Sequence, residues 1–153
     1  MQDLIHRKAT LDDLEKIISL LVEDELGQTR EVNNVADARY VRAFEQIQKD
    51  SNQYLMVVEQ TGEVVGICHL TLMPSLTFTG TTRLNIEAVR VSEKCRGIGI
   101  GAWMIEQAIE YAKMHGAGIV QLTTNKKRGR ALRFYESLGF SASHEGMKLY
   151  FNK

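Results

Sequence analysis

The sequence has few cysteines, a single proline and no net charge, and each shortage excludes a class of protein. With one proline and 44% hydrophobic content in 153 residues, the chain is neither disordered nor collagen-like. Its two cysteines, Cys68 and Cys95, make neither a disulfide scaffold nor a CxxC redox pair. No apolar run approaches the ~18 residues that span a bilayer, and the first residues lack a signal-peptide pattern. We therefore expect one soluble, cytoplasmic domain over residues 1–153, and the scattered histidines predict no metal site.

The zero net charge is a cancellation between two halves. Residues 1–76 hold 7 Lys/Arg and 13 Asp/Glu, a net charge of −6, whereas residues 77–153 hold 12 and 6, a net charge of +6. A chain of zero net charge is not expected to coat nucleic acid or a membrane. The basic half suits an anionic ligand, and the acidic half suits a cationic one.

The hydrophobic pattern predicts an α/β protein with a mixed sheet. Apolar residues at helical spacing predict four helices, at residues 14–22, 35–49, 97–115 and 130–138. Apolar runs and turn signals predict about seven strands, at residues 4–9, 54–59, 64–73, 84–91, 119–123, 140–143 and 147–151. Thr10, followed by Asp12 and Asp13, is typical of a helix cap.

Three alternate glycines join a predicted strand to the third predicted helix, in the segment Gly97-Ile98-Gly99-Ile100-Gly101. Glycine lets a backbone approach a ligand closely, and the free amides of a helix's first turn favour phosphate. The same glycines could simply tighten the turn. They also satisfy a relaxed dinucleotide fingerprint, but no acidic residue follows about 20 positions later, so a nicotinamide dinucleotide is disfavoured.

Three segments, in order and spread over nearly the whole chain, match the signatures of one family. Arg96-Gly97-Ile98-Gly99-Ile100-Gly101 fits Q/R-x-x-G-x-G/A, residues 131–140 fit A-x-x-(F/L)-Y-E-x-L-G-F, and residues 7–14 look like a first strand and helix. Together they resemble the GCN5-related N-acetyltransferase (GNAT) family. The resemblance implies a single GNAT-like domain, with a mixed, mostly antiparallel sheet that splays between its fourth and fifth strands.

The resemblance also implies acetyl-CoA as the acetyl donor. In this family the amides of the glycine turn grip the cofactor's pyrophosphate, which here assigns Arg96, Gly97, Ile98, Gly99 and Gly101 to the cofactor. The fourth strand carries a bulge, and its backbone holds the pantetheine. By that correspondence, backbone groups of Val89 and Val91 hold the pantetheine here.

Two residues are candidates for the proton transfers. Tyr135 matches the tyrosine that protonates the leaving thiolate in the family, although its helical spacing also suits a core aromatic. Glu87 interrupts an apolar strand, where a carboxylate is costly unless it is paired or reaches water. It is therefore our candidate base, directly or through a water, and the alternative is a structural ion pair with Arg83 or Arg90.

One position departs from the family pattern. An asparagine that binds the cofactor commonly lies seven residues before the tyrosine, and here that position is Arg128. Asn125 is a candidate substitute. Both lie beside or within residues 126–133, a cationic run that includes Arg130 and that suits the cofactor's 3′-phosphate better than nucleic acid. A solvated surface is the structural alternative.

These patterns predict an acetyl-CoA-dependent N-acetyltransferase that moves an acetyl group to a primary amine of a small molecule by direct attack in a ternary complex. The end of the first helix (Glu23–Glu25), Tyr40, Phe44 and residues 74–82 are expected to shape the acceptor pocket. A non-catalytic acyl-CoA sensor of the same fold is the alternative, and a nucleic-acid binder ranks third. The resemblance also leaves room for a homodimer.

Overall fold

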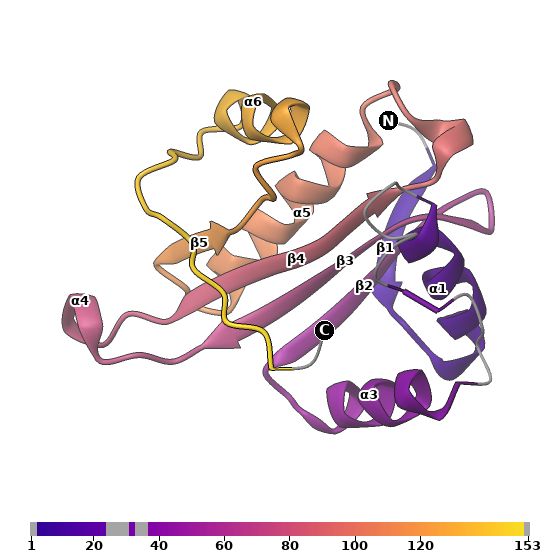
Figure 1. The fold of residues 1–153 in the computed structure, drawn as a ribbon, viewed down its shortest axis with the longest axis horizontal. Coiled ribbons are helices and arrows are strands. Elements are labelled where there is room, and N and C mark those ends of the chain that lie inside the picture. Colours follow the sequence, from indigo (N-terminus) through magenta and orange to yellow (C-terminus); the bar gives the residue numbers. More distant parts are fainter. Residues whose placement is uncertain (1–2, 24–30, 33–36, 152–153) are drawn as a thin grey trace. The chain divides into compact units, whose positions relative to one another are not determined.

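In the described part of the chain, five strands form one sheet in the order β1-β2-β3-β4-β5 (Figure 1). The computed structural model describes residues 3–23, 31–32 and 37–151, and the chain divides into two units, Met1–Gln121 and Leu122–Lys153. The strands are β1 (Leu4–Lys8), β2 (Gln53–Gln60), β3 (Glu63–Met73), β4 (Arg83–Val91) and β5 (Ile119–Leu122). The pairs β1–β2, β2–β3 and β3–β4 are antiparallel. A helix crosses from β4 to β5, which is the connection typical of parallel neighbours, so the sheet is mixed.

The described residues contain five helices, α1 (Leu14–Val22), α3 (Ala38–Lys49), α4 (Thr77–Gly80), α5 (Ile100–Met114) and α6 (Gly129–Ser137), and two short 3₁₀ turns at Leu11–Asp13 and Glu93–Cys95. A capping box starts the first of these turns, because Asp13 accepts from the Thr10 backbone amide at 2.7 Å. Arg7 of β1 donates to the same carboxylate at 2.8 Å and joins the strand to the helix start. In the part of the chain that the structure describes, no helix has the length and apolarity needed to cross a membrane.

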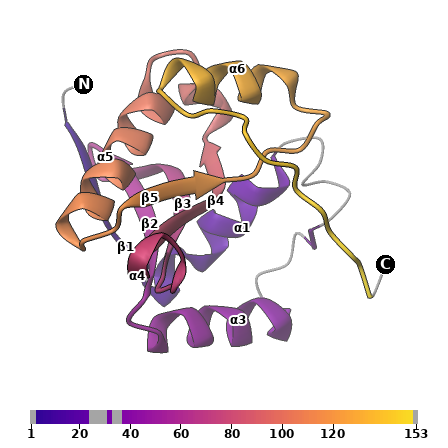
Figure 2. The ribbon, with the colours of Figure 1, turned by 90° about the vertical axis from the view of Figure 1, so that its left-hand side faces the viewer.

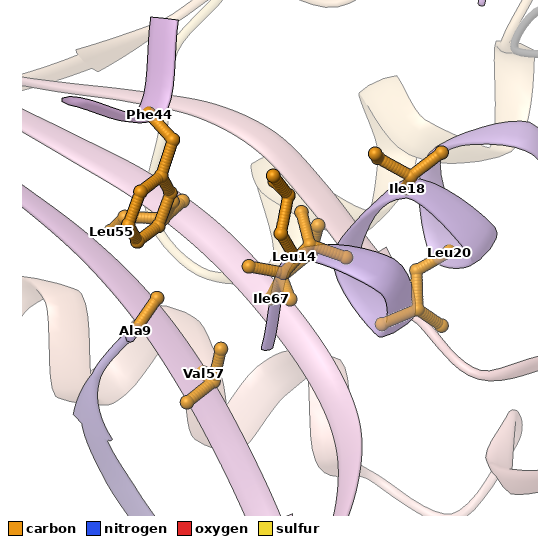
Figure 3. Close-up of a cluster of buried hydrophobic side chains, with 9 residues drawn as sticks. Ala9, Leu14, Ile18, Leu20, Phe44, Leu55, Val57 and Ile67 are labelled. Atoms are coloured by element: carbon orange, nitrogen blue, oxygen red, sulfur yellow. The ribbon is translucent and has the colours of Figure 1, made fainter. Parts of the chain in front are cut away.

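Two layers of helices cover the two faces of the sheet, with α1 and α3 on one side and α5 on the other (Figure 2). Leu14, Ile18 and Phe44 pack against Leu55 and Ile67 in the cluster between α1, α3 and the sheet (Figure 3). Each such side chain adds roughly 1.5–3 kcal/mol when fully buried. Side chains alternate along a strand, so the residues next to Ile67 face α5 instead.

Two predicted strands are wrong, and one helix was not predicted. The structure assigns no strand to residues 140–143 or 147–151, although both have the apolar content of strands. A strand needs a neighbouring backbone to accept its hydrogen bonds, and an apolar pattern alone does not supply that neighbour. α4 lies in the predicted 74–82 loop. Its residues Phe78 and Thr79 have left-handed backbone angles, which the spacing of apolar residues in a sequence does not predict.

Candidate cofactor and acceptor site

A bulge interrupts β4 where the resemblance implies one. Ile67 pairs with Arg90 and His69 pairs with Glu87, so the single residue Cys68 faces two residues of β4, Ala88 and Val89. Ala88 has a φ of 54°, in the left-handed region that costs an ordinary residue about 1–2 kcal/mol. Bulges of this kind change the direction of backbone and side-chain groups, and they are frequent next to active sites. The bulge therefore marks the centre of β4 as a candidate site.

The backbone that follows the bulge leads directly to the glycine turn. Val91 pairs with Gly66 at the end of β4, and the Ser92 amide donates to the Val65 carbonyl at 2.8 Å. The Val91 carbonyl accepts from Arg96 Nε at 3.3 Å, which ties the turn to the strand. Val89 and Val91, the predicted pantetheine contacts, therefore lie in the strand that immediately precedes the turn.

The glycine turn is exposed and needs its glycines. Gly97 and Gly99 have φ values of 82° and 92°, in the left-handed region, and α5 begins at Ile100 directly after them. A Cβ at Gly97 would meet no heavy atom within 4 Å, so the surface beside it is open to a ligand. Ile98 is 54% exposed, whereas Ile100 is buried and anchors the helix. Gly101 lies in the first turn of α5. The first amides of a helix have no partner within the helix, so this turn can offer amides to an anionic ligand.

Acidic residues from other elements contact the 3₁₀ turn Glu93–Cys95, which precedes the glycine turn. Glu23, just after α1, accepts a hydrogen bond from the Glu93 amide at 2.6 Å. Lys94 forms an exposed ion pair with Glu63 at 2.7 Å. The sequence had assigned Glu23 to the acceptor side, whereas the structure shows it bonded to the 3₁₀ turn that precedes the glycines. Asp24 and Glu25, assigned to the same rim, lie outside the described residues.

Glu87 is paired with a histidine that sequence reasoning missed. His69 Nδ1 lies 3.7 Å from Glu87 Oε1, and His69 Nε2 lies 2.7 Å from Gln53 Oε1. The Glu87 side chain is 57% exposed and that of His69 only 14%. Burial lowers the pKa of His69, and the Glu87 carboxylate opposes that shift in part. His69 follows Ile67 on the same strand face, but the partner strand could not be read from the sequence.

The expected alternative partner Arg83 is engaged elsewhere. Its Nη2 donates to Thr77 Oγ1 at 2.7 Å, and its guanidinium carbon lies 5.7 Å from the centre of the Phe78 ring. The guanidinium of Arg90 donates to the Val89 carbonyl at 2.9 Å. Arg83 therefore contacts the β3–β4 connection, and Arg90 contacts the backbone of the bulge.

A cavity of about 180 Å³ adjoins this pair. It lies between α1, α3 and the sheet, and Tyr40 and Phe44, two of the residues expected to shape an acceptor pocket, line it. His69 and the bulge residue Ala88 also line it, so the cavity reaches the irregular part of β4.

The remaining predicted residues belong to the unit Leu122–Lys153. Tyr135 lies in α6, and its ring is 5.1 Å from that of Phe134 and 5.9 Å from that of Phe140, measured between ring centres. Asn125 organises the approach to α6, because its Oδ1 accepts from the Lys127 amide and its carbonyl from the Arg128 amide, both at 2.9 Å. Arg128 occupies the N-cap position of α6 without a capping hydrogen bond from its side chain, and Arg130 follows in the first turn.

The structure therefore brings some predicted site residues together within one unit. Glu87 and the pantetheine and pyrophosphate candidates follow one another along β4, the turn and the start of α5. The proposed acid and the cationic candidates lie in the second unit, around α6.

Comparison with known proteins identifies the class. The arrangement is a mixed α/β sheet with a bulged fourth strand that leads into a glycine turn and a helix. The sequence model of the acetyltransferase (GNAT) family matches residues 15–140. The chain belongs to this family of enzymes.

Two curated relatives have named acceptors. An aminoalkylphosphonate N-acetyltransferase of Salmonella typhimurium is 30% identical over 139 residues, 90% of this chain and 85% of that protein. A glucosamine 6-phosphate N-acetyltransferase of Trypanosoma brucei brucei is 35% identical over 91 residues. That match spans 60% of this chain and 60% of the trypanosome protein.

Among solved structures, one described as a transcriptional regulator from Bacillus halodurans C-125 is 46% identical to this chain. Its TM-score is 0.94, and the match covers 97% of this chain and 99% of that one. The glucosamine-6-phosphate N-acetyltransferase of Arabidopsis thaliana, 24% identical with a TM-score of 0.79, shares the fold.

Proposed function

We propose that this enzyme transfers the acetyl group of acetyl-CoA to a primary amine of a small molecule, by direct attack in a ternary complex. The observation that carries the proposal is the bulged β4 that runs directly into an exposed glycine turn at the start of α5. The amides of residues 96–101 would bind the pyrophosphate. Backbone groups of Val89 and Val91 would hold the pantetheine, in the splay between β4 and β5 that the family resemblance implies.

The proton transfers belong to Glu87 and Tyr135 in this proposal. An alkylammonium with a pKa near that of lysine, about 10.4, must lose a proton before its nitrogen attacks. Glu87, which is exposed and adjoins His69, can take that proton directly or through a water. The departing thiolate, with a pKa near the 8.5 or so of cysteine, leaves more easily when Tyr135 supplies a proton.

The proposal also assigns residues of the unit Leu122–Lys153 to the phosphates of acetyl-CoA. Asn125, Arg128 and Arg130 would meet the cofactor's phosphates, since they lie around the start of α6 in a segment rich in cations. The single domain over residues 1–153 and the cytoplasmic location expected from the sequence stay part of this proposal.

Replacement of Tyr135 by phenylalanine tests the catalytic part. Loss of a general acid typically slows chemistry by about 10²–10⁴-fold. We expect kcat to fall within that range while the Kd of acetyl-CoA, measured by calorimetry, stays unchanged. Tyr111→Phe is the matched control, because Tyr111 stacks on Tyr54 and His115 of the other unit. Unchanged turnover in Tyr135→Phe would remove Tyr135 from the acid role.

A non-catalytic acyl-CoA sensor is the second candidate, and the structural relative described as a transcriptional regulator favours it. Release of CoA thiol against a panel of amines separates the two functions. Turnover supports the enzyme. Tight acetyl-CoA binding without turnover of any amine supports the sensor.

We also propose that two copies of the chain associate. The described C-terminal residues Met147, Leu149 and Phe151 are 93%, 81% and 88% exposed, an unusual density of bare apolar side chains. A second copy is the partner that such a segment would meet at high protein concentration.

A further inference from the structure

The lining of the cavity beside the bulge is apolar except for His69 and for Tyr40, whose hydroxyl donates to Glu31 Oε1 at 3.0 Å. Ile17 of α1, Phe44 of α3, and Leu55 and Ile67 of the sheet supply hydrocarbon walls. At the corner next to the bulge lies His69, with Glu87 3.7 Å away, so on this side the apolar space ends at a carboxylate–imidazole pair. Its volume of about 180 Å³ is comparable to that of an engineered apolar cavity of about 150 Å³ that binds benzene. There is room for the body of a small ring or a branched alkyl chain.

The charges around the cavity discriminate between classes of amine. Among the described residues that line it, none is a lysine or an arginine. A phosphate or phosphonate, present in the acceptors named for two relatives, would therefore lose water there without gaining a cation. An ammonium group at the corner would instead meet the Glu87 carboxylate.

The orientation of His69 fits the same ligand. The amide oxygen of Gln53 accepts a hydrogen bond, so His69 Nε2, 2.7 Å from it, carries the hydrogen. Nδ1 then presents its lone pair on the side of Glu87, where it can accept a hydrogen bond from an amine. Burial lowers the pKa of His69 and keeps the ring neutral near pH 7, and the other titratable group in the lining, Tyr40, has a raised pKa and also stays neutral.

We propose that the acceptor is a primary amine with a compact apolar body, such as an arylalkylamine or a branched alkylamine. The body fills the cavity between α1, α3 and the sheet, and the amino group lies at the His69–Glu87 corner beside the β4 bulge. This inference rests on the proposed acetyl transfer and names its acceptor.

The experiment that tests this proposal measures kcat/KM for different amine acceptors, with the full chain as enzyme and acetyl-CoA as donor. We expect kcat/KM for 2-phenylethylamine and isopentylamine to exceed that for 2-aminoethylphosphonate and glucosamine 6-phosphate by at least about 100-fold. Within a series of alkylamines, each methylene that the cavity buries should raise kcat/KM by roughly fourfold, until the cavity is full.

A filling variant tests the cavity itself. Ala43 lines it from α3, and Ala43→Leu should lower kcat/KM for 2-phenylethylamine by about tenfold while ethylamine and the Kd of acetyl-CoA change little. Gln46→Leu adds the same leucine to an exposed position of α3 outside the lining and should leave both amines unaffected. Calorimetric binding of 2-phenylethylamine to the CoA-bound wild-type protein gives a second readout that needs no variant.

The outcomes separate this inference from the proposed function. Turnover of the phosphorylated or phosphonylated amines with none of the apolar ones overturns the apolar acceptor and leaves acetyl transfer in place. Equal effects of Ala43→Leu and Gln46→Leu on 2-phenylethylamine also overturn it. Acetyl-CoA binding without turnover of any amine contradicts the proposed acetyl transfer, and the acceptor falls with it.

Discussion

Gly97 and Gly99 show how single residues create the candidate site. Both have left-handed backbone angles, which a residue with a Cβ adopts only at a cost, and both lie where α5 leaves its first amides exposed. A glycine with a similar angle, Gly116 (φ 73°), follows the other end of the same helix. The two ends of α5 therefore provide an internal comparison of strain with and without the proposed ligand.

Gly97→Val and Gly116→Val should destabilise the protein by a similar amount, about 1–2 kcal/mol, because neither Cβ would meet a heavy atom within 4 Å. Only Gly97→Val should also weaken acetyl-CoA binding, by about tenfold or more, since its side chain would stand over the proposed pyrophosphate site. Calorimetry gives the Kd and thermal unfolding the stability. Equal Kd values for the two variants would contradict the assignment of the turn.

The His69–Glu87 pair predicts how activity depends on pH. Protonated His69 can no longer accept from the amine, so kcat/KM should fall as pH drops through the pKa of His69, which burial holds below its ordinary 6.5. The Glu87 carboxylate raises that pKa in part, so Glu87→Gln should lower it further and shift the acid limb to lower pH. Nuclear magnetic resonance titration of the His69 ring measures the shift directly.

Glu110→Gln is the control for this prediction, because Glu110 is exposed on α5 and pairs with Lys113 at 3.3 Å. It should leave the His69 titration in place. A shift to higher pKa in Glu87→Gln would exclude the electrostatic coupling on which the prediction depends.

At the scale of elements, the junction between β1 and α1 depends on one carboxylate. Asp13 accepts from both terminal nitrogens of the Arg7 guanidinium, at 2.8 and 2.9 Å, and from the Thr10 amide at 2.7 Å. Arg7 also bonds to Glu59 of β2. Because α1 supplies one wall of the cavity, this junction fixes that wall against the sheet.

Asp13→Asn should lower the free energy of unfolding at pH 7 by about 1–3 kcal/mol. The Arg7 guanidinium lowers the pKa of Asp13 below its usual 3.8, so this stability is present above pH 3.8 and is lost as pH falls through the folded-state pKa. The difference between wild type and variant should therefore shrink in acid, as urea unfolding at several pH values would measure. Exposed Asp12→Asn is the matched control, and an equal loss in both would refute the role of Asp13.

At the scale of the whole molecule, the exposed C-terminal apolar residues predict self-association. Light scattering after gel filtration should show a dimer for the wild type. The variant with Met147, Leu149 and Phe151 all replaced by serine should be a monomer, since it removes the apolar area that would be buried. Serine at Leu76 and Phe78, which are 94% and 71% exposed in the β3–β4 connection, is the control and should leave the dimer intact. A monomeric wild type would contradict the dimer.

The sequence by itself determined most of the fold and the family. Five of seven predicted strands and all four predicted helices are present, because their apolar periodicity reflects faces that this structure buries. The glycine turn was also predictable, since left-handed backbone is a local property that glycine reveals. The last two predicted strands failed because hydrogen bonding to a neighbour is not a local property.

Only the tertiary structure decided what surrounds the predicted residues. Glu87 is recognisable as an interruption in an apolar strand, but the register of β3 on β4 places His69 opposite it. The left-handed Ala88 gives no compositional signal, because the register change between two strands creates it. The apolar cavity likewise needs α1 and α3 packed on one face of the sheet, and the apolar acceptor that we propose is inferred from that packing. A sequence motif reflects the local conformation that the backbone must adopt, whereas a pocket forms from segments that are distant in the sequence and close in the fold.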